Sequence, residues 1–229
     1  DVIAVVNSED FHQKCEAWIG TNSVGFALMN TQSYNLVDMK DDEEERGAAN
    51  GRAIYRALEI CATVDDFCHY LDTISKPSMI EANFGVIDAQ GGALMIEVDY
   101  YTYKVYDVND HAVAAGYVVR TNFSVSGTHG IGAGVVRYQE AERILRPMGD
   151  ERNITPQRIF DEVARSFHNC VLDIDLKQPP FTGPNTSGWF VDQDFISRSS
   201  TSCSVVVQGV KPGERAELTT MWTVLGYPP

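Results

Sequence analysis

The chain has 229 residues, a formal net charge of −14 and a composition in which 44% of the residues are hydrophobic. This length and composition suit one globular domain over residues 1–229 with a sizeable core. The acidic excess argues against nucleic acid as a partner, because phosphate binding needs a clustered basic face. No apolar run approaches the ~20 residues that span a bilayer, which argues against a membrane partner.

The cysteines and histidines do not form a recognisable metal-binding or disulfide pattern. The five cysteines are widely spread without a CxxC pair, and the five histidines contain no HExxH pair. We therefore predict no metal site and no disulfide framework. Cys61 and Cys68 are seven residues apart and would share a helical face, where we interpret them as small core residues.

The first expected elements are strands. Val2–Val6 is a β-branched run, and Trp18–Thr21 and Gly25–Met29 flank a polar turn, which predicts a hairpin. The acidic run Asp38–Glu45 follows and is interpreted as a solvated loop that leads to a helix.

Two helices are expected next. Apolar residues recur at helical spacing over Ala48–Ile60 and again over Val64–Ile74. Thr63, with Asp66 three residues later, resembles a capping box at the start of the second helix. Pro77 follows the second helix.

Strands return after the helices. Phe84–Asp88 and Ala93–Val98 flank a glycine-containing turn and predict a hairpin, and Thr102–Val108 and Ala112–Thr121 predict two further strands of a meander.

The last part of the chain begins with helices again. Arg137–Leu145 has helical spacing, and Thr155 followed by Pro156 is typical of a helix start. Residues 177–188 are rich in proline, glycine and polar residues and predict a long loop. Ser204–Val210 and Leu218–Leu225 predict a final hairpin. Because strands and helices are segregated into runs, we expect an α+β fold with antiparallel sheets.

Four features are candidates for chemistry. Gly127–Gly134 follows an expected strand and precedes a helix, but its spacing fits neither GxGxxG nor a Walker loop, so we interpret it as a connection. Asn30 and Asn122 lie at the ends of apolar strands, where an amide can donate to a developing oxyanion, although asparagine is also common there as a turn residue. Arg198 could hold a carboxylate or orient a carbonyl, or it could be an ordinary surface arginine.

Several segments in this order resemble one family. The segments are Trp18-Ile-Gly-Thr-Asn-x-x-Gly-Phe-Ala-x-x-Asn-Thr31, Asn83-Phe-Gly-Val-Ile-Asp-Ala89, Thr121-Asn-Phe123 with Ser126-Gly127, and Arg137-Tyr138 opening a helix. They are similar to acyl-coenzyme A:6-aminopenicillanic acid acyltransferase-like peptidases, which are N-terminal nucleophile hydrolases related to choloylglycine hydrolase and the acid amidases. The resemblance is clearest from about Ala17 to Leu145.

The resemblance implies a four-layer αββα sandwich, in which two antiparallel sheets lie between helical layers. It also implies hydrolysis of, or acyl transfer from, a linear non-peptide carbon–nitrogen amide bond in a small acyl amide substrate, without a cofactor. In such enzymes an N-terminal cysteine attacks the carbonyl, and its own α-amino group accepts the proton because the pKa of that amine is near 8.

Carried over by position, the resemblance makes Asn30 an oxyanion-hole residue, Asn122 a residue that holds the tetrahedral intermediate, and Arg198 a substrate-binding residue. The family's nucleophilic cysteine has no counterpart in this chain, since Cys15 is neither terminal nor in the family's setting. We therefore expect a chain that is incomplete at both ends, lacks its nucleophile segment and is inactive alone.

Alternatives from other classes stay open. One is a relative on the same scaffold that binds an acyl amide without catalysis, and another is a general α+β interaction domain. Homo-oligomer formation and the compartment, with export or a periplasmic location included, are also left open, as are the acyl and amine specificities.

Overall fold

The computed structural model describes residues 1–8, 15–38, 46–112, 116–182 and 189–227, so residues 39–45 of the acidic run lie outside the described part. The chain divides into two compact units, which we call unit 1 (Asp1–Ala133 with Val207–Met221) and unit 2 (Gly134–Val206 with Trp222–Pro229). The fold is α+β with an antiparallel sheet, as the sequence predicts. A single domain over residues 1–229 stays a prediction.

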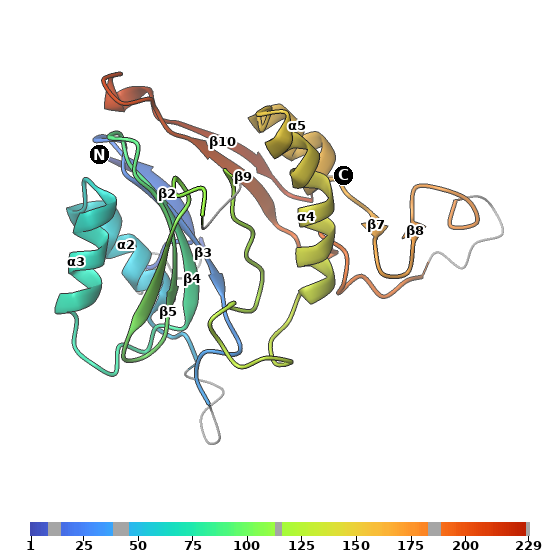
Figure 1. Cartoon of the computed structure of the whole chain (residues 1–229), viewed down its shortest axis with the longest axis horizontal. Coiled ribbons are helices and arrows are strands. Elements are labelled where there is room, and N and C mark those ends of the chain that lie inside the picture. Colours follow the sequence, from blue (N-terminus) through green and yellow to red (C-terminus); the bar gives the residue numbers. More distant parts are fainter. Residues whose placement is uncertain (9–14, 39–45, 113–115, 183–188, 228–229) are drawn as a thin grey trace. The chain divides into compact units, whose positions relative to one another are not determined.

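Unit 1 is built on a six-stranded antiparallel sheet in which each strand pairs with the next one along the chain (Figure 1). This order confirms the expected meander and places every consecutive strand beside its neighbour. The strands are β1 (Val2–Val5), β2 (Ile19–Asn22), β3 (Ala27–Gln32), β4 (Ala82–Ile87), β5 (Ala93–Val98) and β6 (Tyr103–Asp107).

Two helices, α2 (Asn50–Ile60) and α3 (Val64–Thr73), cover one face of this sheet (Figure 1). The predicted capping box is present at the start of α3: the Thr63 hydroxyl accepts from the Asp66 N–H, and the Asp66 carboxylate accepts from the Thr63 N–H. These bonds satisfy backbone donors that a helix start leaves without intrahelical partners.

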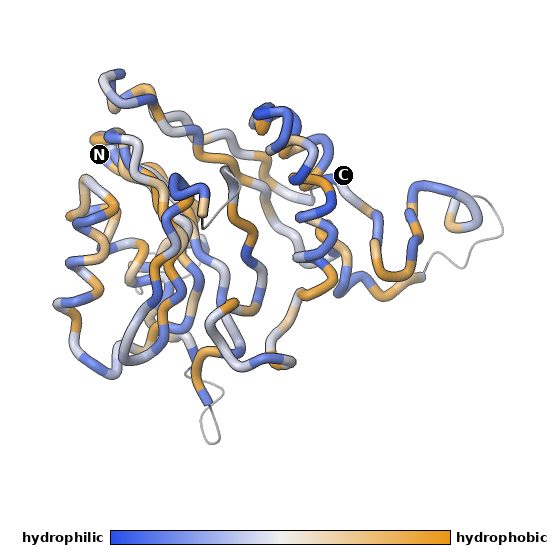
Figure 2. The backbone as a smooth tube through the Cα atoms, viewed as in Figure 1, coloured by the Kyte–Doolittle hydropathy of each residue, from blue (hydrophilic) through white to orange (hydrophobic). Residues whose placement is uncertain are grey.

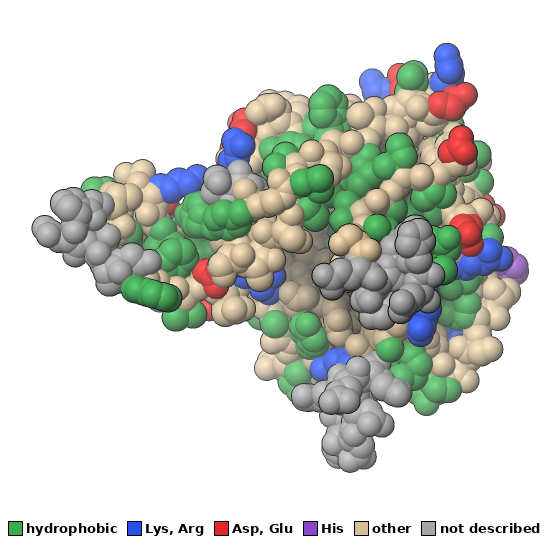
Figure 3. All heavy atoms as spheres, turned by 180° about the vertical axis from the view of Figure 1, so that it is seen from behind, with side chains coloured by type: hydrophobic (Ala, Val, Ile, Leu, Met, Phe, Trp, Pro, Cys, Tyr) green, Lys and Arg blue, Asp and Glu red, His purple; other side chains and the backbone are tan. Residues whose placement is uncertain are grey.

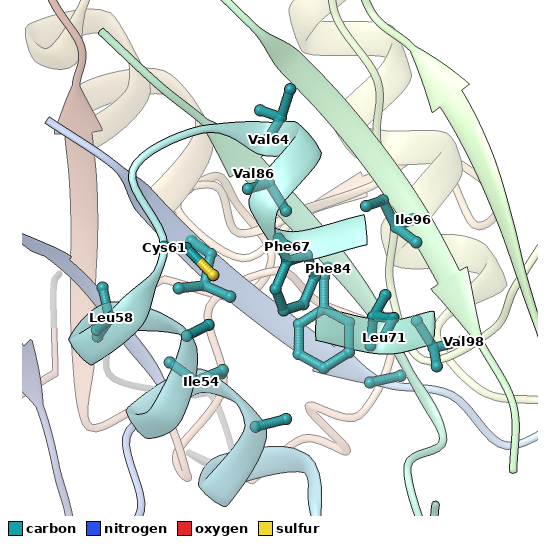
Figure 4. Close-up of a cluster of buried hydrophobic side chains, with 14 of the residues drawn as sticks. Ile54, Leu58, Cys61, Val64, Phe67, Leu71, Phe84, Val86, Ile96 and Val98 are labelled. Atoms are coloured by element: carbon teal, nitrogen blue, oxygen red, sulfur yellow. The ribbon is translucent and has the colours of Figure 1, made fainter. Parts of the chain in front are cut away.

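The core of unit 1 lies between these helices and the sheet (Figure 4). Alternate residues of β4 and β5 point towards the helices, so Phe84 and Ile96 are fully buried. Phe67 of α3 packs edge-on against Phe84, with ring centroids 5.4 Å apart. Cys61 is buried in this core and Cys68 packs against it, which confirms their interpretation as core residues.

The strand predicted over Ala112–Thr121 is wrong for its described part. Residues 116–121 form no strand, and the next residue, Asn122, makes an isolated bridge to Ala133. At the end of this stretch, the Thr121 carbonyl accepts from the side chains of Thr31 on β3 and Asn83 on β4 in place of a neighbouring strand. The apolar pattern of this stretch is therefore not that of a paired strand.

Unit 2 contains the longest helix, α4 (Val135–Asp150), which extends beyond the predicted Arg137–Leu145 at both ends. Hydrophobic and hydrophilic residues alternate along it (Figure 2), and its buried residues are Glu140, Ala141, Ile144 and Met148. The predicted helix start at Thr155 is confirmed, since its hydroxyl accepts from the Arg158 N–H. The helix α5 (Pro156–Arg158) then continues as a π-helix, Ile159–Ala164.

The remaining strands form two small sheets. β7 (His168–Asn169) pairs with β8 (Ile174–Asp175), and β9 (Cys203–Gln208) pairs with β10 (Thr220–Leu225), which follows a short 3₁₀ helix at Ala216–Leu218. The described residues thus form one large sheet, and two large sheets remain an expectation. Within the same residues, no helix has both the length and the apolar character needed to cross a bilayer.

Candidate functional site

A row of polar side chains crosses the face of the large sheet that points away from α2 and α3. Thr31 of β3 is the cross-strand partner of Asn83 of β4, Asn83 is the partner of Glu97 of β5, and Glu97 is the partner of Lys104 of β6. Asn83 and Glu97 are 0% and 1% exposed. Because neighbouring strand residues point to opposite faces, this row lies behind the core residues Phe84 and Ile96.

A coil segment, residues 119–128, lies against this row, and we call it the 119–128 segment. The Thr31 hydroxyl donates to the Thr121 carbonyl, and the Asn83 amide donates to the carbonyls of Thr121 and Phe123, both at 3.1 Å. The Ser124 hydroxyl donates to Asn83 Oδ1 at 2.5 Å. Side chains of the sheet therefore satisfy backbone groups that a strand would pair.

Asn35, just beyond β3, holds the same segment from a second side. Its amide donates to the Ser124 carbonyl at 2.9 Å, and its Oδ1 accepts from the Ser124 N–H at 2.8 Å. The Ser33 hydroxyl donates to Asn35 Oδ1 at 2.9 Å, and its oxygen lies 2.9 Å from the Ser124 hydroxyl oxygen. Ser124 is consequently fixed through its N–H, its carbonyl and its hydroxyl.

The predicted site residue Asn122 lies within the 119–128 segment. Its side-chain Nδ2 donates to the Gln32 carbonyl at the end of β3 at 2.9 Å, and its own carbonyl accepts from the Ala133 N–H at 3.1 Å. The flanking residues Thr121 and Phe123 are both held by Asn83, so the position of Asn122 is well defined.

The predicted site residue Asn30 lies two residues before Gln32 on β3. The bond of Asn122 is therefore to the strand that carries Asn30, and no contact between the two asparagines themselves is implied. The alternation of side chains places Asn30 on the same face as the core residue Leu28, whereas Thr31 points to the 119–128 segment. Asn122 thus contacts β3 two residues beyond Asn30, and Asn30 is not part of the polar row.

Glu97 makes the densest set of contacts with the 119–128 segment. Its carboxylate accepts from Arg120 Nε at 2.6 Å and from the N–H groups of Val125 and Ser126, each at 2.8 Å. The Ser126 hydroxyl and, at 3.3 Å, the Tyr106 hydroxyl also donate to it. Burial by itself raises the pKa of Glu97, but these hydrogen bonds and the charge of Arg120 outweigh it and hold the pKa below its usual value.

The glycine-rich stretch 127–134 owes two of its glycines to close packing. A Cβ on Gly127 would lie 2.5 Å from the Asn35 amide, and a Cβ on Gly132 would lie 2.6 Å from Cβ of Phe123. Gly132 also has a φ of +110°, which disfavours other residues. Gly127 and Gly132 thus pack closely against Asn35 and Phe123, two residues of the site. This packing agrees with the interpretation of the stretch as a connection.

A cavity of about 320 Å³ opens beside the polar row in unit 1. Its lining combines carboxylates, hydroxyl groups and one lysine, so it is a polar space next to the end of the 119–128 segment. The lining residues are Asn35, Leu36, Glu97, Asp99, Thr102, Tyr103, Lys104, Ser126, Gly127 and Thr128. Burial and a hydrogen bond to Asp72 raise the pKa of Tyr103 to about 12, so this phenol is neutral at physiological pH.

Arg198, the predicted substrate-binding residue, belongs to unit 2, whereas Asn30 and Asn122 belong to unit 1. Its backbone is held by a turn in which its N–H donates to the Thr201 hydroxyl at 3.1 Å and its carbonyl accepts from the Thr201 N–H at 2.9 Å. Its Nε is buried and has no hydrogen-bond partner within the part of the chain that the structure describes. Its charge contributes to lowering the pKa of Asp192, after the hydrogen bonds from Ser199.

Unit 2 has a polar cavity of its own, also of about 320 Å³, which includes His168 and Arg143 in its lining. Behind them lies Glu140, which is 0% exposed. It accepts two bonds from the guanidinium of Arg143, and its Oε2 lies 2.9 Å from His168 Nδ1. Burial by itself raises the pKa of Glu140, but its hydrogen bonds with Arg143 and His168 outweigh this effect and hold the pKa below its usual value. The carboxylate is therefore charged and orients the imidazole ring of His168.

Three cysteines have environments that disfavour the thiolate. Burial raises the pKa of Cys61 to about 12, and it also raises the pKa of Cys68 and Cys170. A reactive thiol needs the opposite shift, since the thiolate is the attacking form. Cys15 is exposed and Cys203 is partly buried.

The sequence interpretation missed Asn83 and Glu97 as parts of a site. A signal for both exists, because each is a polar residue inside an apolar strand, in ANFGVI and ALMIEV. Buried polar side chains in such positions need partners, and a charge needs several. The partners themselves lie in another segment, which the local pattern does not identify.

On the face shown in Figure 3, the Lys and Arg side chains of the described residues are scattered and do not form one continuous field. Within the described residues, no group of three or more His, Cys, Asp or Glu side chains is arranged to hold a metal ion.

The sequence was compared with protein-family models and with curated proteins. No family model matches the chain, and no curated protein matches it.

Proposed function

We propose that this chain forms part of an enzyme that hydrolyses a linear carbon–nitrogen amide, or transfers its acyl group, with Asn122 as a donor to the oxyanion. The proposal rests on the motif resemblance and on one structural observation. Asn122 sits in a segment whose neighbouring backbone groups are fixed by buried side chains, and its own amide bonds the end of β3. An oxyanion donor must be held in place before the reaction, so this rigidity supports the role.

The proposal extends to the architecture. The six-stranded sheet with α2 and α3 on one face corresponds to one helical layer and one sheet of an αββα sandwich. The opposite face carries the polar row, which is where a catalytic crevice would lie. Arg198 remains a predicted substrate-binding residue, and no cofactor is invoked. Asn30 is predicted as a second oxyanion residue, but its side chain lies on the helix-facing side of β3, so this crevice is proposed with Asn122 alone.

The attacking group in this proposal is a residue other than Cys61, Cys68 and Cys170, because their raised pKa values disfavour the thiolate. In the family that the motifs resemble, this group is an N-terminal cysteine. The same observation favours a second function, in which the scaffold binds an acyl amide without turnover. Under either function the ligand class is a small acyl amide.

Turnover by the full-length protein tests the proposal. A series of acyl p-nitroanilides with increasing acyl length would be supplied, and release of p-nitroaniline followed by absorbance. Asn122→Ala should lower kcat by about 10²–10³-fold, as loss of one oxyanion donor does in other enzymes. Asn109→Ala is the matched control, since Asn109 Nδ2 donates to the Gly91 carbonyl at the same 2.9 Å, but at an exposed turn.

Equal turnover of Asn122→Ala and Asn109→Ala would remove Asn122 from the reaction. Binding of the p-nitroanilides in a calorimeter with no amine release by the wild-type protein would instead select the noncatalytic function. Mass spectrometry after reaction with a thiol-directed acylating probe separates the two functions independently, because only the enzyme should acquire one acyl group at a single residue.

A further inference from the structure

Glu97 is a buried charge whose partners come mainly from one segment. It is 1% exposed, and four of its five hydrogen bonds come from Arg120, Val125 and Ser126, all in the 119–128 segment. A buried carboxylate is tolerated when it is fully hydrogen-bonded, and removing its charge leaves its donors without partners. Glu97 therefore links β5 to both sides of Asn122 in sequence.

The segment is held by side chains more than by strand pairing, and Asn35 fixes Ser124 between the two groups of residues that Glu97 binds. The segment's backbone bonds to other parts of the described chain include the isolated bridge between Asn122 and Ala133 and the bond from the Thr128 N–H to the Asn35 carbonyl. Asn83 holds the carbonyls before and after Asn122, and Asn83 is itself the cross-strand partner of Glu97. Glu97 and Asn83 thus act side by side from neighbouring strands, one on the N–H groups and one on the carbonyl groups.

We infer that Glu97 is a positioning residue, which fixes the amide of Asn122 by clamping Arg120 on one side and Val125 and Ser126 on the other. This inference rests on the proposed function only for its consequence in catalysis. Glu97 need not touch the substrate, because its effect reaches Asn122 through the backbone of the 119–128 segment. A misplacement of about 1 Å at a reacting group can lower a rate by about 10²-fold, so such a clamp can matter for turnover.

The matched control is Glu81, a second fully buried carboxylate. It accepts from two consecutive N–H groups as Glu97 does, here those of Leu36 and Val37, and its carboxylate lies 2.8 Å from Arg46 Nε in an ion pair. Glu97→Gln and Glu81→Gln each replace one buried carboxylate by an amide of nearly the same shape. They differ in the segment that is released, and only Glu97→Gln should affect Asn122.

The readout is the side-chain amide resonance of Asn122 in ¹⁵N–¹H spectra of the full chain, assigned by its loss in Asn122→Asp. Glu97→Gln should shift this resonance and speed hydrogen exchange of the Val125 and Ser126 amides by about tenfold, which corresponds to ~1.4 kcal/mol. Glu81→Gln should leave the resonance in place and speed exchange at Leu36 and Val37. If Glu97→Gln does not fold, Ser126→Ala, which removes one donor to the same carboxylate, carries the test.

Turnover adds a second readout that a purely structural role would not produce. Glu97→Gln should lower kcat for the p-nitroanilides by about 10²-fold at a nearly unchanged KM, because binding does not require the displaced amide. An Asn122 resonance that is identical in Glu97→Gln and wild type would overturn the inference. A shifted resonance in a protein whose wild type releases no amine would support the positioning role and refute the proposed enzyme function.

Discussion

Asn83 and Glu97 are direct partners across β4 and β5, both are almost completely buried, and both bind the 119–128 segment. Asn83 donates to carbonyl groups of the segment, whereas Glu97 accepts from its N–H groups. The two residues therefore complement each other in hydrogen bonding, and only Glu97 carries a charge. That combination predicts how substitutions here will behave.

Asn83→Asp should be strongly destabilising. It removes the donors to the Thr121 and Phe123 carbonyls and places a second carboxylate opposite Glu97, where like charges repel. We expect a loss of about 3–5 kcal/mol at neutral pH, as for a buried charge without a partner. Urea unfolding measures it, with the exposed Asn153→Asp as the control, and a loss equal to that of the control would contradict this account of Asn83.

Glu97 and Glu81 should respond to pH in opposite directions. The lowered pKa of Glu97 means that its ionisation stabilises the fold above the usual glutamate pKa, ~4.3, and that this stabilisation is lost as the pH falls through the folded-state pKa. For Glu81, burial has the largest effect and raises the pKa. The N–H groups of Val37 and Leu36 and the charge of Arg46 lower it by less. Its ionisation therefore disfavours folding, and stability from this group falls as the pH rises from ~4.3 through the raised pKa.

The measurement is the free energy of unfolding of wild type, Glu97→Gln and Glu81→Gln between pH 3 and pH 7, the range around the glutamate pKa. The advantage of wild type over Glu97→Gln should shrink as the pH falls below ~4.3. The free energy of unfolding of wild type relative to that of Glu81→Gln should fall as the pH rises above ~4.3. Parallel curves for the two variants would show that the two environments do not differ as described.

Gly132 and Gly130 form a matched pair for the packing of the glycine-rich stretch. Both have a positive φ, +77° at Gly130 and +110° at Gly132, which strains an alanine at either position. A Cβ at Gly130 meets nothing within 4 Å, whereas one at Gly132 would lie 2.6 Å from Cβ of Phe123. Gly132→Ala should therefore lower stability by a further ~1–3 kcal/mol relative to Gly130→Ala. Thermal unfolding of both variants checks the difference, and equal melting temperatures would argue against the close approach.

Phe67→Ala tests the core of unit 1. Phe67 is fully buried and contacts both Phe26 and Phe84, with ring centroids 6.4 and 5.4 Å away. Its removal should cost about 3–5 kcal/mol, which is typical when a buried phenylalanine leaves a cavity. Denaturant unfolding measures the loss, with Phe181→Ala in an exposed loop as the control. A loss below ~1 kcal/mol would be inconsistent with a tightly packed core.

The sequence by itself determined the local elements of this protein. Alternating and helical patterns identified the six strands and both helices of the large sheet's unit, and Thr63 with Asp66 marked the start of α3 correctly. These features follow from interactions within a few residues, namely side-chain periodicity and capping bonds. Cys61 and Cys68 were also expected in the core and lie in it or against it, although they do not share a helix face as their spacing suggested, since Cys61 follows α2 and Cys68 lies on α3.

Only the tertiary structure decided the conformation of the 119–128 segment and the residues that hold it. Its apolar pattern suggested a strand as far as Thr121, but Asn35, Asn83 and Glu97, which are distant in sequence, satisfy its backbone groups and keep it as a coil. The same contacts bring Asn122 to Gln32 at the end of β3. A Glu inside an apolar strand indicates that a buried carboxylate will need hydrogen-bond donors. Only the folded chain determines which segment provides them.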